Sequence, residues 1–260
     1  MMHALRVAWS AADVQFREVA VNNFLLFGAL VQPFFIGVTT MLMLRHRPDF
    51  DPMYVVVGAA LSGLWSTLLF SGSGAITHER WMGTLELLVA SPTSLVVIFG
   101  GKLVGTIAFS LVSLILSYGV GAWLFGYSLT IADPGGFAIS LLFALIALWV
   151  MGMLFAPLAI YWRPVGQFLN ILEYPVFSLS GFLFPILLLP GWTVPVSDVL
   201  PPYWAAVAMH GAARGNLDLA GQASAWLNII VLSAVLLVVS LLMFRAVLVR
   251  ARRAGTLALT

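Results

Sequence analysis

Long apolar stretches with almost no charge constrain this chain more than any other feature. The segments 103–132 and 137–162 contain no Asp, Glu, Lys or Arg. A helix of about 20 apolar residues crosses the hydrocarbon core of a bilayer. Only 8% of the 260 residues are charged, against roughly 25% in a soluble domain. These stretches predict a membrane protein that crosses the bilayer several times.

The predicted fold class is all-α, with six transmembrane helices in one membrane domain over residues 1–260. The expected spans are 24–44, 53–75, 94–125, 137–162, 169–189 and 225–248. Pro33 is expected to kink the first span, and Lys102 to extend from the third span toward the interface. The segment 190–221 is rich in proline and is neither a clean span nor a solvated loop.

The N-terminal segment, residues 1–23, has apolar residues at spacings of three and four, which places them on one face of a helix. They are Leu5, Trp9, Ala12, Phe16 and Val19. Charged residues lie between them. This pattern predicts an amphipathic helix in the membrane interface, with a short solvated tail as the alternative.

The distribution of basic residues predicts the orientation, because Lys and Arg concentrate on the cytoplasmic side. Placing both termini in the cytoplasm puts most of them inside, including Arg80, Arg163 and the C-terminal arginines. Arg45 and Arg47 go against the rule. The predicted location is the cytoplasmic membrane, with several passes.

The side chains that metal and redox chemistry require are scarce. The chain has no cysteine, and its four histidines lie far apart in sequence. None of the histidines has a second His or a carboxylate at metal-ligand spacing. Neither a paired Ser/His/Asp arrangement nor an H-E-x-x-H motif points to an intramembrane hydrolase. We expect no catalytic residue, no metal site and no cofactor of the chain's own, and the small net charge of +2 does not favour nucleic acid.

The most informative segment is 78–92, between the second and third predicted spans on the predicted cytoplasmic side. It reads HERWMGTLELLVASP. Its apolar part is too short to cross a bilayer, so it predicts a short helix on the membrane surface that ends before Pro92. The plain alternative is a polar loop in which Arg80 serves only as a cytoplasmic anchor.

This segment resembles that of the membrane subunits of ABC-2 exporters, the type-2 ATP-binding-cassette family, which reads approximately E-R-E-x-G-T-L-E-x-L-x-x-S-P. Trp81 departs from it, where the family commonly has a second acidic residue. The matching residues are Glu79, Arg80, Gly83, Thr84, Leu85, Glu86, Leu88, Ser91 and Pro92.

Weaker likenesses extend the resemblance over nearly the whole chain. The sequence YPVFSLSGFLFP at 174–185 is similar to the family's fifth span. The sequences LPGW at 189–192 and LPPY at 200–203 are similar to its outer re-entrant helices. Asn23 with Gln32-Pro33 is similar to its entry into the first span, although the usual Arg-Asn-Pro is replaced.

The resemblance implies a coupling helix in segment 78–92 that docks onto a separate ATPase subunit. Gly83 would allow its sharp entry. One face would be anchored by Leu85, Leu88 and Val89. The charged residues Glu79, Arg80 and Glu86 would face the ATPase. Lys102 would lie outside this surface, so Lys102→Gln is expected to be mild.

The resemblance also implies two permease copies, as a homodimer or a related heterodimer, with two ATPase subunits that bind ATP and Mg²⁺. The expected substrate is amphipathic or hydrophobic, such as a drug, a lipid or a lipid-linked compound. The chain has no phosphate-binding loop, because Val96 and Leu103 flank Gly101-Lys102 where Gly and Ser or Thr are required. Gly101 and Gly105 predict close helix packing within the chain, with a dimer contact as the alternative.

An ionisable residue within a span is costly and often functional. Glu173 lies near the start of the fifth predicted span. It either lines the transport path or pairs with Arg163, and we favour the pairing. Further candidates for the path or an inner gate are Phe177, Phe182 and Phe184. The rival function is an ion-coupled secondary transporter, which would show mid-span ionisable residues and inverted repeats. Neither is evident.

Overall fold

The computed structural model describes residues 2–23, 27, 31–46, 51–91, 93–125, 130–161 and 165–254. All regular structure in these residues is helical. Four stretches are long and apolar enough to cross a membrane, namely Pro52–Arg80, Leu95–Val112, Pro134–Ile160 and Leu219–Arg250. They lie in helices α4 (Pro52–Trp81), α6 (Leu95–Phe125), α7 (Pro134–Tyr161) and α11 (Leu219–Ala254).

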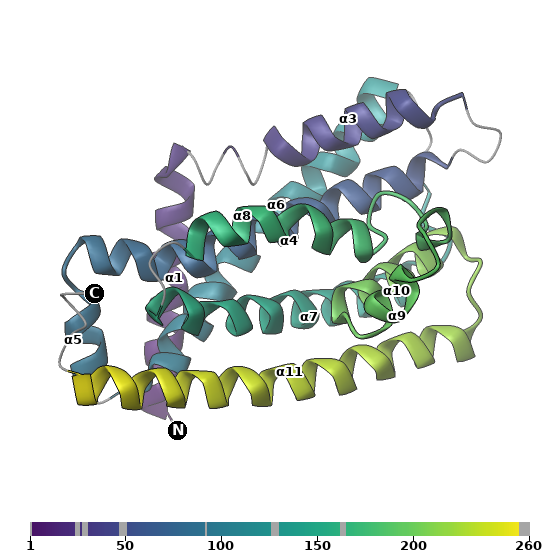
Figure 1. Cartoon of the computed structure of the whole chain (residues 1–260). Coiled ribbons are helices and arrows are strands. Elements are labelled where there is room, and N and C mark those ends of the chain that lie inside the picture. Colours follow the sequence, from purple (N-terminus) through teal and green to yellow (C-terminus); the bar gives the residue numbers. More distant parts are fainter. Residues whose placement is uncertain are drawn as a thin grey trace.

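Shorter helices complete the described fold. They are α1 (Met2–Val21), α3 (Gln32–Leu44), α5 (Leu85–Ala90), α8 (Val165–Leu179), the 3₁₀ turn η2 (Ile186–Leu188), α9 (Thr193–Asp198) and α10 (Pro201–Arg214). Figure 1 shows α5 near the C-terminal end of α11, while α9 and α10 lie at the opposite end of the bundle. The bundle therefore has two distinct ends, which we call the α5 end and the α10 end.

Helix α4 forms the centre of the bundle. It packs against α3, α6, α7, α8 and α10. Within its most apolar 18-residue stretch, 89% is buried. Large side chains such as Leu61, Leu64, Trp65 and Leu68 are fully buried there. Glycine and alanine between them let neighbouring helices approach closely, as small residues do in membrane helix packing.

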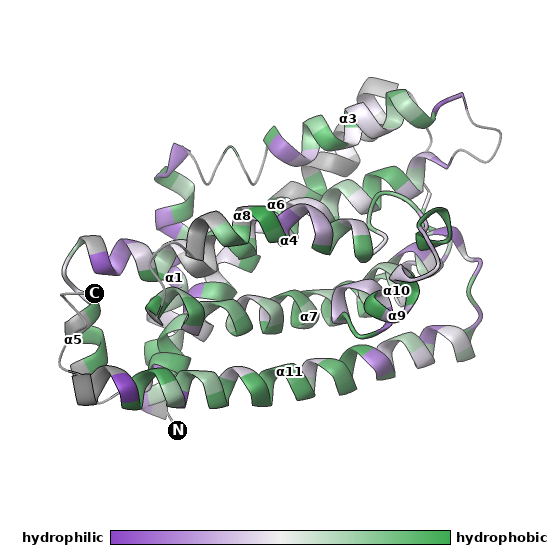
Figure 2. Cartoon of the chain, in the orientation of Figure 1, coloured by the Kyte–Doolittle hydropathy of each residue, from purple (hydrophilic) through white to green (hydrophobic). Residues whose placement is uncertain are grey.

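Helix α11 is peripheral. It packs along α7, yet only 22% of its most apolar window is buried. Figure 2 shows apolar residues along most of its length. The side chains of Leu227, Val231 and Val238 are 60%, 50% and 56% exposed. A helix that is apolar all round and open on one side suits contact with lipid chains.

The fifth predicted span, 169–189, is wrong in its extent, because α8 already ends at Leu179. Gly181 has a φ of +67°. The Phe182 N–H bonds the Phe177 carbonyl and the Gly181 N–H bonds the Ser178 carbonyl. This is a Schellman ending with glycine in the left-handed conformation. It satisfies the last carbonyls of the helix, so the chain can turn within an apolar sequence.

Two prolines lie in the first turn of helices. Pro33 is the second residue of α3, and Val31 just before it is π-helical, so the predicted kink at Pro33 stays a prediction. Pro134 begins α7. The Asp133 side chain accepts from the Gly136 N–H at 3.0 Å and caps that first turn.

Helix α1 crosses α6 (Figure 1). The predicted apolar face of α1 is divided. Ala12 and Val19 are buried, whereas Leu5, Trp9 and Phe16 are 64%, 76% and 41% exposed. Small residues face the bundle because the helices touch backbone to backbone. A Cβ on Gly101 would lie 2.3 Å from the Ala8 carbonyl oxygen, and one on Gly105 2.1 Å from that of Ala12. The structure therefore uses these glycines within the chain.

Candidate coupling site

The turn between α4 and α5 is built on Gly83. Its φ is +69°, in the left-handed region that favours glycine. The Thr84 N–H bonds the Glu79 carbonyl at 2.9 Å, and the Gly83 N–H bonds the Arg80 carbonyl at 3.1 Å. This is a second Schellman ending. It turns the chain sharply out of α4 and into α5, as the sequence predicted for this glycine.

Glu79 faces the bundle and not the surrounding medium. Its carboxylate accepts from the Lys102 ammonium of α6 at 2.6 Å, and it also accepts from the Thr84 hydroxyl. The Lys102 side chain is 7% exposed and that of Glu79 is 17% exposed. The two side chains thus pair with each other inside the bundle, and the predicted contact of Glu79 with a partner stays a prediction. A buried ammonium needs a counter-charge, and Glu79 supplies it.

Arg80 also points inward. Its guanidinium donates to the carbonyls of Ala159 and Ile160, at 3.2 and 2.7 Å. These carbonyls belong to the last turn of α7, where a helix has unsatisfied acceptors and partial negative charge. Arg80 therefore caps α7, and its predicted contact with a partner stays a prediction. Together, Glu79 and Arg80 fasten the end of α4 to α6 and α7.

Helix α5 has a buried face and an exposed face. Leu85 and Val89 are 2% and 7% exposed, and Leu88 packs against the core. Leu87 is 70% exposed, and Met82, in the preceding turn, is 67% exposed. The segment thus presents two large apolar side chains outward at the α5 end. Neither residue was among the contacts predicted from the sequence.

Two further predicted residues have limited descriptions. Ser91 ends α5 in an extended conformation, and its hydroxyl donates to the Thr93 carbonyl at 3.1 Å. Glu86 belongs to α5, but its side chain lies outside what the structure describes, so its predicted contact with a partner stays a prediction.

A comparison with known protein families identifies the family of this chain. The model of the ABC-2 type transporter family matches residues 7–213, from the first helix to the end of α10. The chain belongs to this family. No curated protein matches it significantly. The chain is thus a multi-pass ABC-2 permease, and its membrane domain does not carry an ATPase site.

A second polar cluster lies inside the permease, around Glu173. Glu173 is 4% exposed. Its carboxylate accepts from Gln32 Nε2 at 2.7 Å and from the Ser66 hydroxyl. The Trp65 indole N–H donates to the Glu173 backbone carbonyl at 3.3 Å. The favoured partner, Arg163, lies outside the described residues. The cluster joins α3, α4 and α8.

The other candidate path residues pack in the core of the permease. Phe177 and Phe182 are 6% and 0% exposed, and Phe184 is partly buried against the core. The Phe182 carbonyl oxygen would lie 1.9 Å from a Cβ on Gly58, so the turn after α8 is pressed against α4. A role of these three residues in transport stays a prediction.

Glu173→Leu should lower the free energy of unfolding by about 1–3 kcal/mol, because Gln32 and Ser66 lose a buried acceptor. Glu173→Gln should cost much less, since its amide oxygen can still accept and no buried charge remains. Thermal unfolding of the purified variants in detergent measures both. Equal losses for the two variants would contradict this assignment of the cluster.

Proposed function

We propose that the chain is the permease subunit of an ATP-driven exporter. It would move an amphipathic or hydrophobic substrate, such as a drug, a lipid or a lipid-linked compound, out across the cytoplasmic membrane. The observation that carries the proposal is the coupling segment. It is fastened inward by Glu79 and Arg80 and presents Met82 and Leu87 outward. A force on α5 would pass to α4, α6 and α7 together.

The proposed arrangement in the membrane has six spans per copy and both termini in the cytoplasm. The α5 end is the cytoplasmic side, and α9 and α10 form an outer re-entrant segment within 190–221. The opposite positions of α5 and α10 support this orientation (Figure 1). Two copies, identical or related, would assemble with two ATPase subunits. ABC-2 permeases generally pair with such subunits, which would bind the ATP and Mg²⁺.

Leu87→Glu should weaken recruitment of the ATPase subunit about tenfold or more, because burial of a leucine side chain contributes roughly 1.5–3 kcal/mol. The fold should be unaffected, since Leu87 makes no part of the core. Co-purification with the ATPase and thermal unfolding in detergent measure the two effects separately.

Leu219→Glu is the matched control. Leu219 is 80% exposed at the start of α11, far from the α5 end. It should retain wild-type ATPase recruitment. Normal recruitment by Leu87→Glu, or ATP hydrolysis by the isolated chain, would contradict the proposal.

The second candidate function, ion-coupled secondary transport, is favoured by one observation, the buried Glu173 carboxylate bonded to neutral donors. Vesicles that contain the permease and its ATPase distinguish the two. Uptake of a hydrophobic dye that requires ATP and does not change with a proton gradient supports the exporter. Uptake driven by the proton gradient alone supports the secondary transporter.

A further inference from the structure

The short helices at the α10 end have polar side chains inside and apolar side chains outside. In α9, Thr193 and Ser197 are 3% and 0% exposed, and their hydroxyls donate to the carbonyls of Pro190 and Thr193. Large apolar side chains are exposed instead, namely Leu187, Leu188, Trp192, Val194, Val196 and Val199. Water favours the reverse arrangement, and hydrocarbon favours this one. The segment 185–197 also has no charged residue, so it suits a lipid environment.

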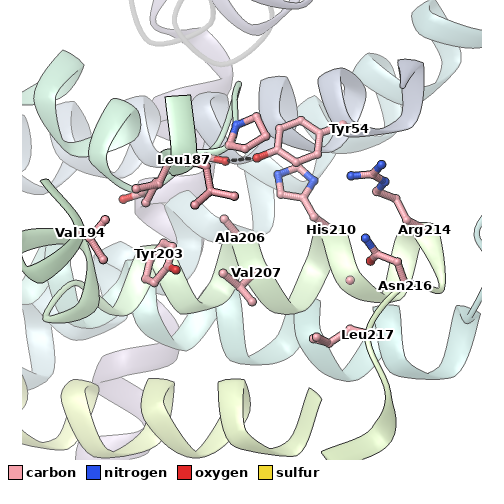
Figure 3. A pocket seen from close by; sticks show the side chains of 15 residues that line it. Tyr54, Leu187, Val194, Tyr203, Ala206, Val207, His210, Arg214, Asn216 and Leu217 are labelled. Carbon is pink, nitrogen blue, oxygen red and sulfur yellow. Dashed lines mark hydrogen bonds between the residues drawn. The ribbon is translucent and has the colours of Figure 1, made fainter. Parts of the chain in front are cut away.

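A cavity of about 330 Å³ lies beside this segment. It opens between the start of α4, helix α10 and the turn that follows α8 (Figure 3). Lining residues on α10 recur at spacings of three and four, so one face of the helix runs along the cavity. They are Tyr203, Ala206, Val207, His210, Gly211 and Arg214.

The size of the cavity matches part of one lipid leaflet. From Tyr203 to Arg214, α10 rises about 16 Å, which is close to half of the roughly 30 Å thickness of a hydrocarbon core. The volume of about 330 Å³ is at the lower end of the range for small-molecule sites. The cavity therefore suits one hydrocarbon chain better than the two chains of a whole lipid.

The two ends of the cavity differ in polarity. Leu187 and Val194 lie at one end, and Arg214 and Asn216 lie at the other (Figure 3). Leu187 is 92% exposed, so the apolar end opens beside the exposed apolar side chains of the 185–199 segment. An amphiphile has the same two-ended chemistry, with a chain that prefers the first end and a head group that prefers the second.

The polar end of the cavity lies level with the start of two spanning helices. The Arg214 guanidinium pairs at 2.8 Å with Asp51, the residue that caps α4. The Asp133 N–H, just before α7, bonds the Ala212 carbonyl at 3.1 Å. Lipid head groups lie at the level where spanning helices begin. Because Asp51 balances the charge of Arg214, this end is polar but does not select the charge of a head group.

We propose that the cavity binds one acyl chain of a lipid from the surrounding leaflet. The head group would lie at the Arg214 end, and the end of the chain would lie near Leu187 and Val194. The chain would fill the space between α4 and α10 and hold the two helices at their present spacing. The inference rests on the proposed function only in naming this leaflet as the outer one.

The test uses two photoreactive phosphatidylcholines in nanodiscs of unlabelled phosphatidylcholine. One carries a diazirine at the end of an acyl chain, and the other carries it beside the head group. Peptide mass spectrometry should find the chain-end label at Tyr203 and Val207, and the head-group label at Asn216. Absence of both labels from 203–217, as expected for a cavity that holds only water or is covered by a second copy, would overturn the proposal. Identical labelling by the two probes would also overturn it.

Native mass spectrometry of washed, detergent-solubilised protein measures the strength of binding. Wild type should retain one phosphatidylcholine per copy. Val207→Trp and Val194→Trp fill the cavity from α10 and from α9, and each should lower retention about fivefold or more because the chain loses apolar contact. Val231→Trp is the matched control, since Val231 is half exposed on α11 and does not line the cavity. It should retain the lipid.

Thermal unfolding in detergent identifies which variants fold, and Val194→Trp decides the test if Val207→Trp does not fold. Full retention by a folded variant that fills the cavity would overturn the proposal. Addition of the ATPase subunit and ATP should leave the labelling of α10 unchanged, because a resident lipid is not exported. Labelling that falls during ATP hydrolysis would assign the cavity to the transported substrate and overturn the lipid assignment.

The binding assay needs neither ATP nor the ATPase, so it separates this proposal from the exporter itself. A permease that takes up dye with ATP but shows no label on α10 refutes the lipid site alone. A labelled permease whose vesicles show no ATP-driven uptake refutes the exporter alone.

Discussion

Lys102→Gln should destabilise the permease by about 3 kcal/mol, because removing one partner of a buried ion pair leaves the other charge unpaired. The Lys102 ammonium lies 2.6 Å from Glu79, and both side chains are largely buried. The variant should also lose ATP-driven transport, since the end of α4 that leads into α5 would no longer be fastened to α6. Chemical unfolding in detergent and vesicle uptake measure these effects. The result would reverse the mild outcome expected from the sequence.

Arg17→Gln provides the control, because it also removes a cation from a salt bridge. The Arg17–Asp13 pair is 3.1 Å long, but its side chains are 77% and 50% exposed. Exposed pairs contribute about 0–1 kcal/mol, so this loss should be small. Lys102 is the only lysine in the chain. Amine-reactive labelling of its peptide should be slow in wild type and faster in Glu79→Gln. Equal stability of Lys102→Gln and Arg17→Gln would refute the buried pair.

Gly105→Ala should displace α1 from α6, with a loss of about 1–3 kcal/mol in the free energy of unfolding, as overpacking typically costs. The new Cβ would lie 2.1 Å from the Ala12 carbonyl oxygen, which is backbone and cannot rotate away. Gly101→Ala should act alike, and the double variant should be worse. Cysteines introduced by Phe16→Cys and Phe109→Cys, where the rings now pack at 5.7 Å, should cross-link less in the glycine variants.

The same substitution further along α6 tests the reason for the effect. A Cβ on Gly119 would meet nothing within 4 Å, so Gly119→Ala should be neutral or slightly stabilising through its helix propensity. If Gly105→Ala and Gly119→Ala behave alike, the close contact between α1 and α6 does not exist in the membrane.

The long helices could be predicted because hydrophobic length is a local property. The predicted spans 94–125 and 137–162 closely match the helices α6 (Leu95–Phe125) and α7 (Pro134–Tyr161). The end of α8 could not be read in the same way, since Gly181 stands in an apolar run on both sides. Only the backbone bonds of the turn reveal it. Ser180-Gly181 was a usable signal for a helix end, but it was interpreted only as part of the likeness to the family's fifth span.

In segment 78–92, the position could be predicted from the sequence, but the directions of the charged side chains could not. Its position and the Gly83 turn followed from the motif. The directions of Glu79 and Arg80 did not, because their partners lie 23 and about 80 residues away on other helices. One signal was available. A single lysine within an apolar stretch must find a counter-charge when helices pack around it, and Glu79 and Glu86 were the two acidic residues in the preceding segment on the same predicted side.

The way Arg80 and Glu79 hold α4 affects how tightly ATP use would be tied to transport. A carboxylate fixed by a buried ammonium and a guanidinium fixed by two helix-end carbonyls leave little slack between α5 and the bundle. In the proposed complex, a movement of the ATPase subunit would therefore move the bundle and would not only bend segment 78–92. ATP hydrolysis without transport would then require the Glu79–Lys102 pair or the Arg80 hydrogen bonds to break. The rate of that breakage would set the rate of uncoupled ATP hydrolysis.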